Sequence, residues 1–100
     1  MVSNKDKILD ISVNLARVSD WAASQNLQKK IRVDQFLSET DGFVRSINAN
    51  GVSSKFKPTW VKFSSEFKKL LQNRDSEDKL EWAEKALTWA NILQHRAKLA

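Results

Sequence analysis

Cysteine is absent from the 100 residues of this chain. A disulfide framework, a thiolate metal site and a cysteine nucleophile are therefore excluded. The absence fits a reducing compartment, and we expect a cytoplasmic protein. Histidine occurs once, at His95, and no glutamate lies three residues before it. Because the Glu-x-x-His pattern of di-iron helical bundles is missing, we expect no metal site and no other cofactor.

Long hydrophobic runs are missing as well. The longest stretch without Asp, Glu, Lys or Arg covers residues 86–95, whereas a transmembrane helix needs about 20 apolar residues. The polar start of the chain also lacks the apolar core of a signal peptide. We therefore expect no role at a membrane.

Glycine and proline are scarce, with two glycines and one proline in the whole chain. Because these residues interrupt secondary structure, their scarcity predicts long, uninterrupted secondary-structure elements. Gly42 and Gly51 stand alone, so there is no glycine-rich phosphate loop and no Gly-x-Ser-x-Gly elbow. Since only one histidine could serve as a base, and no pair of carboxylates has a spacing typical of catalysis, we expect a protein that is not an enzyme.

The last quarter of the chain carries the strongest helical pattern. One row of apolar residues repeats at spacings of three and four, which defines one face of an α-helix: Leu80, Ala83, Leu87, Ala90, Leu93 and Ala97. A second row lies beside it: Trp82, Ala86, Trp89 and Leu93. Together they form a wide apolar band, which predicts a helix buried by several neighbours.

Similar spacings predict three further helices, and strand signals are absent. The predicted helices cover residues 4–25, 28–49, 59–73 and 76–98. Ser3 and Asn26 are candidate N-caps, Asp75 or Ser76 opens the fourth helix, and Asn50-Gly51 predicts a left-handed C-cap after the second. A break at Gly42 is the alternative to one continuous second helix. We predict an all-α, antiparallel four-helix bundle, with residues 1–100 forming a single helical domain.

Positive charge is concentrated in the third quarter. Residues 52–74 carry six basic side chains and one acidic one, which accounts for a net charge of +5. Cations bind phosphates, and flat rings stack on unpaired bases. Nucleic-acid or acidic-partner binding is therefore the alternative function that we consider, and its candidate residues are Lys55, Phe56, Lys57, Lys62 and Lys69. Glu66 lies between the last two lysines, and most nearby aromatics follow the core spacing.

The preferred function rests on the surplus of large apolar residues over catalytic ones. A small bundle with more apolar surface than it can hide commonly presents a partner site. Four residues are the candidates for such an interface: Phe36, Phe43, Trp82 and Trp89. We expect a non-enzymatic interaction or adaptor module that self-associates or binds a protein partner through apolar helix faces. No small-molecule substrate is implied.

Overall fold

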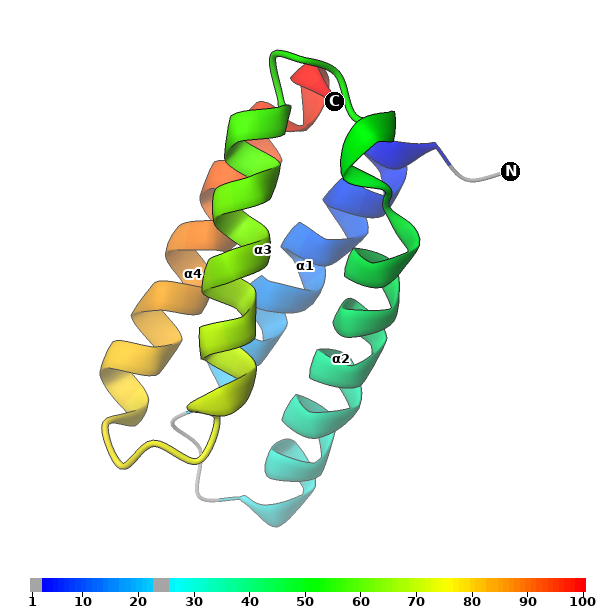
Figure 1. Cartoon of the computed structure of the whole chain (residues 1–100). Helices are drawn as coiled ribbons and strands as arrows, with labels where there is room; N and C mark the ends of the chain where they lie inside the picture. The colour runs from blue at the N-terminus through cyan, green and yellow to red at the C-terminus, as the bar shows by residue number, and fades with distance from the viewer. Residues whose placement is uncertain (1–2, 23–25) are drawn as a thin grey trace.

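The computed structural model describes residues 3–22 and 26–100, and these form a bundle of four α-helices (Figure 1). The helices are α1 (Asn4–Ala22), α2 (Leu27–Ser46), α3 (Lys57–Gln72) and α4 (Lys79–Arg96). Two single-turn 3₁₀ helices, η1 (Ala49–Gly51) and η2 (Ala97–Leu99), follow α2 and α4. Successive α-helices run in opposite directions, which confirms the predicted all-α antiparallel bundle. Within the described residues, none of the helices has the length and apolarity that crossing a lipid bilayer requires.

The first helix is the centre of the bundle, because it packs closely against both α4 and α2. Small side chains at the contact allow the backbones of α1 and α4 to pack closely together. The hydroxyl of Ser12 donates to the carbonyl of Ala90 at 2.9 Å, and that of Ser19 donates to the carbonyl of Ala83 at 2.8 Å. These two bonds sit two helical turns apart on each helix, so they fix the register of α1 against α4.

The third helix packs through aromatic rings. Phe56, Trp60, Phe63 and Phe67 follow one another at spacings of three and four, and all four are buried. Phe63 also contacts Trp89 of α4, with ring centroids 5.5 Å apart. Because these side chains are long and wide, the backbones of α3 and α4 stay further apart than those of α1 and α4. This spacing leaves room for hollows along the α3–α4 seam.

The second helix starts where its cap was predicted but ends earlier. Asn26 accepts from the backbone N–H of Gln28 at 2.9 Å, which confirms it as an N-cap. The helix continues through Gly42 without a break. The predicted left-handed cap at Asn50-Gly51 is wrong, because no described residue there has a positive φ. Instead Ile47 becomes extended and buries its side chain, so α2 ends at Ser46.

The first helix also begins at its predicted cap. The hydroxyl of Ser3 accepts from the N–H of Asp6 at 3.1 Å. The helix was predicted to extend to residue 25, but residues 23–25 lie outside the described part of the chain, which places the last described helical residue at Ala22.

The fourth helix begins later than predicted. Its N-cap is Asp78, whose carboxylate accepts from the N–H of Glu81 at 3.0 Å. Ser76 instead accepts from the N–H of Asp78 at 3.2 Å, in the link before the helix. The predicted start at Asp75 or Ser76 is therefore wrong, since the cap that closes the first turn lies two or three residues further on.

Both predicted rows of α4 contribute to its buried face, but two leucines of the first row do not. Leu80 and Leu87 are 67% and 44% exposed, whereas Trp82, Ala86 and Leu93 are buried. Ala83 and Ala90 of the first row are buried, because α1 approaches α4 over them. The two leucines consequently lie beyond this contact, on the outer side of the helix.

Candidate functional site

The four residues predicted to form an apolar interface lie in separate places. Phe36 packs on Trp21 of α1, with ring centroids 5.2 Å apart, and the guanidinium of Arg17 lies 5.7 Å from its ring centre. Phe43 is half-buried against the core. Trp82 is 5% exposed. Trp89 is half-buried and faces the α3–α4 seam. These side chains therefore do not form one continuous surface.

The residues predicted to bind a nucleic acid or an acidic partner fall into two groups, one exposed and one buried. Lys55, Lys57, Lys62 and Lys69 are all exposed. Phe56, in contrast, is fully buried, with its ring centroid 6.3 Å from that of Trp60. Its ring cannot stack on a base, because it fills the first position of the inward-facing aromatic row of α3. Of the predicted set, only the lysines can contact a partner.

A groove follows the α3–α4 seam, and we call it the α3/α4 groove. It consists of three hollows of about 250, 80 and 110 Å³ that share lining residues. The first is lined by Pro58, Thr59, Lys62, Trp89, Ile92 and Arg96. The second is lined by Glu66, Lys69, Leu70, Asn73, Lys85 and Trp89. The third is lined by Asn73, Ser76, Asp78, Glu81, Trp82 and Lys85.

Hydrogen bonds between α3 and α4 close the groove near each end. At one end the guanidinium of Arg96 donates to the hydroxyl of Thr59 at 2.8 Å. At the other end the indole N–H of Trp82 donates to the carbonyl of Leu70 at 3.0 Å. The two helices are thus tied together at both ends, and Trp89 lies between the ties.

Charge is distributed unevenly along the groove. Lys62 and Arg96 line the first hollow, which has no acidic residue. Asp78 and Glu81 line the third, where Lys85 pairs with Glu81 at 3.2 Å. In the middle hollow, Lys69 lies 3.5 Å from Glu66. The lining residues are therefore net positive at the Arg96 end and in the middle hollow, which Lys85 also lines, and net negative at the Asp78 end.

Sequence reasoning missed Arg96, Thr59 and Ile92 as members of this site. Arg96 lies in the last turn of α4, where a positive charge is favourable in itself, so its charge does not mark it as a site residue. It lies 37 positions from Thr59, and no periodicity links the two. The one available signal was Trp89, which belongs to the second apolar row of α4 and was predicted as an interface residue.

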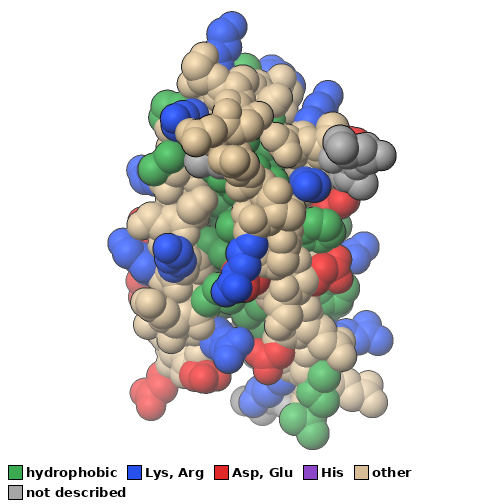
Figure 2. Space-filling view, turned by 45° about the vertical axis from the view of Figure 1, so that its right-hand side comes forward, with side chains coloured by type: hydrophobic (Ala, Val, Ile, Leu, Met, Phe, Trp, Pro, Cys, Tyr) green, Lys and Arg blue, Asp and Glu red, His purple; other side chains and the backbone are tan. Residues whose placement is uncertain are grey.

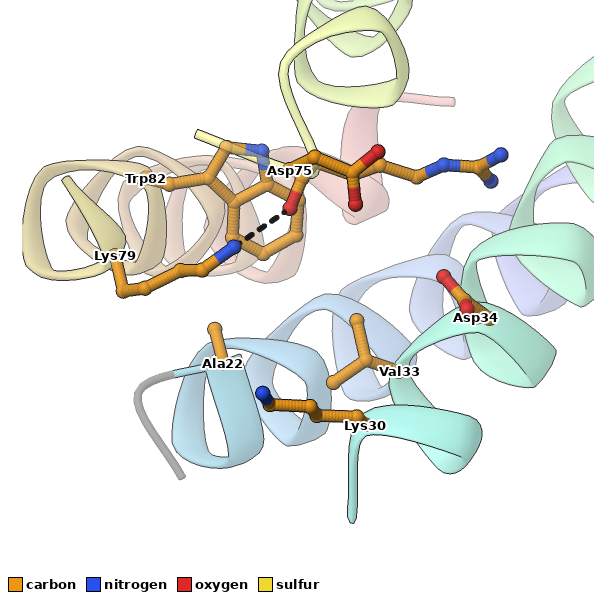
Figure 3. A pocket seen from close by; sticks show the side chains of 8 residues that line it. Ala22, Lys30, Val33, Asp34, Asp75, Lys79 and Trp82 are labelled. Carbon is orange, nitrogen blue, oxygen red and sulfur yellow. Dashed lines mark hydrogen bonds between the residues drawn. The ribbon is translucent and has the colours of Figure 1, made fainter. Parts of the chain in front are cut away.

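A second cavity, of about 200 Å³, lies where the end of α1, the start of α2 and the α3–α4 link meet. We call it the Lys79 cavity (Figure 3). Its lining residues are Ala22, Lys30, Val33, Asp34, Arg74, Asp75, Lys79 and Trp82. The ammonium of Lys79 donates to the backbone carbonyl of Arg74 at 3.1 Å, which fixes one cation at the cavity wall.

The Lys79 cavity belongs to a wider opening between α2 and α3. A further hollow of about 250 Å³ lies between these helices, lined by Leu37, Ser38, Asp41, Leu71, Gln72 and Arg74. Arg74 lines both spaces. In Figure 2, hydrophobic side chains are visible in the middle of this face, with charged side chains of both signs around them. The opening exists because α2 packs mainly on α1.

Metal-binding chemistry has no assembled site in the described residues, where no three His, Cys, Asp or Glu side chains gather. His95 is exposed on the last turn of α4.

Comparison with known proteins identified no relative of this chain. No family model matches the chain, and no curated protein or solved structure is similar to it.

Proposed function

We propose that this protein is a non-enzymatic interaction module that self-associates through the face carrying the α3/α4 groove. The observation that carries the proposal is the reversal of charge along the groove, around the half-buried ring of Trp89. Half-buried tryptophans are common anchors of protein interfaces. The proposed setting is the cytoplasm, which the lack of cysteine fits.

The partner that matches this charge pattern is a second copy of the chain. In a two-fold dimer, the same surface of each copy contacts the other. If the two-fold axis lies across the helices, the Arg96 end of one groove meets the Asp78 end of the other. If the axis runs along the helices, like charges meet instead. Charge therefore selects the antiparallel arrangement, because like-charge juxtaposition costs several kcal/mol.

A nucleic acid fits the same groove less well. Lys55, Lys57 and Lys62 are exposed near the Arg96 end, which favours phosphate binding there. However, a nucleic acid is negative along its whole length, and Asp78 and Glu81 would repel it at the other end. A partner with both signs of charge matches the full groove.

The expected dimer is weak and reversible. The 18 residues of α4 give the face a length of about 27 Å, and two helix diameters give it a width of roughly 20 Å. Such a face covers roughly 500 Å², which is below the roughly 800 Å² per partner of a standard stable interface. Salt should weaken the association, because exposed charges select its orientation.

A charge-swap experiment tests the proposal. We expect Lys62→Glu and Glu81→Lys each to weaken self-association by about tenfold or more, because each places like charges together. An equimolar mixture of the two variants should recover dimers, since one copy then supplies the missing sign. Leu87→Glu is the matched control, because Leu87 lies on the outer side of α4 and should leave association unchanged.

Three results would contradict the proposal: no recovery in the mixture, loss of association on Leu87→Glu, or a monomer at every concentration. Titration with single-stranded RNA at low salt separates the alternative. RNA binding that Lys62→Glu weakens, by a protein that stays monomeric, would replace self-association with nucleic-acid binding.

A further inference from the structure

The Lys79 cavity opens on the side of the bundle between α2 and α3, and Trp82 is the one lining residue that it shares with the α3/α4 groove. Only two residues of α2, Leu37 and Thr40, are buried. Since α2 is held mainly by α1, the side chains of residues 3–22 and 26–100 leave a space between α2 and the α3–α4 link. This space is a hollow at the surface, beside the buried ring of Trp82.

One part of the cavity wall is apolar. Ala22, Val33 and Trp82 contribute from α1, α2 and α4 (Figure 3). The indole N–H of Trp82 is already bonded to the carbonyl of Leu70. The ring therefore offers its carbon surface to the cavity and no free donor, which suits a hydrocarbon or aromatic group.

The rest of the wall is charged, with an excess of cations. Lys30, Arg74 and Lys79 face two carboxylates, Asp34 and Asp75, which leaves one formal positive charge. None of these five charged side chains forms an ion pair within 4 Å in the described ranges 3–22 and 26–100. One N–H of the Lys79 ammonium is bonded to the carbonyl of Arg74, and two remain to bind an anion.

We propose that the Lys79 cavity binds a small organic monoanion, a carboxylate attached to a short apolar or aromatic group. The carboxylate contacts Lys79 and Lys30, and the apolar group lies against Trp82 and Val33. A volume of about 200 Å³ is smaller than the roughly 300–1,000 Å³ of drug-sized sites, so the ligand is small. One net positive charge matches a monoanion, whereas a doubly charged phosphate would meet Asp34 and Asp75 with a charge left uncompensated.

Benzoate is a suitable probe, and benzamide is its uncharged counterpart of nearly the same shape. We expect benzoate to shift the Trp82 indole N–H signal in a proton–nitrogen NMR titration, with saturation and a dissociation constant on the order of 1 mM or lower. Benzamide should bind at least about tenfold more weakly, because it lacks the charge. Inorganic phosphate should leave the Trp82 signal unchanged.

Variants locate the site. Lys79→Gln and Lys30→Gln should each weaken benzoate binding severalfold, and Ala22→Leu should abolish it by filling the space while leaving the cations in place. Lys69→Gln is the matched control, because it removes the same charge from the groove face. The proposal is overturned if benzoate gives no saturable shift, if benzamide binds equally well, or if Lys69→Gln weakens binding as much as Lys79→Gln does.

Discussion

Arg96 of α4 donates a hydrogen bond of 2.8 Å to the hydroxyl of Thr59, which is 7% exposed in the first turn of α3. This bond joins the last turn of one helix to the first turn of another. It also directs the guanidinium of Arg96 toward the positive end of the α3/α4 groove. One contact therefore contributes both to the packing of the bundle and to the charge of its candidate interface.

A double-mutant cycle measures this contact. We expect Arg96→Gln and Thr59→Val each to lower the free energy of unfolding, with a coupling between them of about 1 kcal/mol, typical of one hydrogen bond. Urea unfolding followed by circular dichroism provides the four values. A coupling near zero would mean that Arg96 and Thr59 do not interact in solution.

Phe56 should behave as a core residue and not as a nucleic-acid contact. Because its ring is fully buried in the aromatic row of α3, Phe56→Ala should cost about 3–5 kcal/mol of stability. Lys55→Ala, at the exposed neighbouring position, should change stability by less than about 0.5 kcal/mol. Thermal or urea unfolding checks both values, and equal effects of the two substitutions would show that the ring is not buried.

The start of α4 can be located by capping. Asp78→Ala should cost about 1 kcal/mol, because the N–H of Glu81 loses its acceptor. Asp75→Ala should cost little, since Asp75 lies in the link before the helix, three residues ahead of the N-cap Asp78. Urea unfolding of both variants compares the two positions. If Asp75→Ala lowered the free energy of unfolding more than Asp78→Ala does, α4 would begin at the residue predicted from the sequence.

Close approach of α1 and α4 depends on small side chains at their seam. Ser12 is buried and bonded to Ala90, so Ser12→Leu should push the helices apart and cost about 1–3 kcal/mol through overpacking. Ser12→Ala, which keeps the space and loses one hydrogen bond, should cost about 1 kcal/mol. Unfolding by urea distinguishes the two, and a Ser12→Leu variant as stable as the Ser12→Ala variant would indicate a loose seam.

The helices could be predicted because the apolar spacing in each segment is local information. The edge of the buried band of α4 was harder to predict, since the exposed Leu80 and Leu87 follow the same helical spacing as their buried neighbours. Only the approach of α1 over Ala83 and Ala90 shows that Leu80 and Leu87 lie beyond the contact. The buried position of Phe56 could have been inferred, because it lies four residues before Trp60 and continues the row of α3.

The candidate sites could not be predicted from spacing. The groove joins Lys62 to Arg96, and the Lys79 cavity joins Lys30 to Lys79. These residues lie on different helices, and tertiary packing alone brings them together. The lysines of residues 52–74 were recognised from their charge, but the acidic residues that make one end of the groove negative, Asp78 and Glu81, lie at the start of α4.

Sedimentation equilibrium at several protein concentrations, in low and in physiological salt, tests the central proposal most directly. Self-association through the α3/α4 groove predicts a weight-average mass that rises from one chain of 11.5 kDa toward two chains as concentration increases, and that falls when salt is added. A mass of one chain at every concentration in low salt would contradict it.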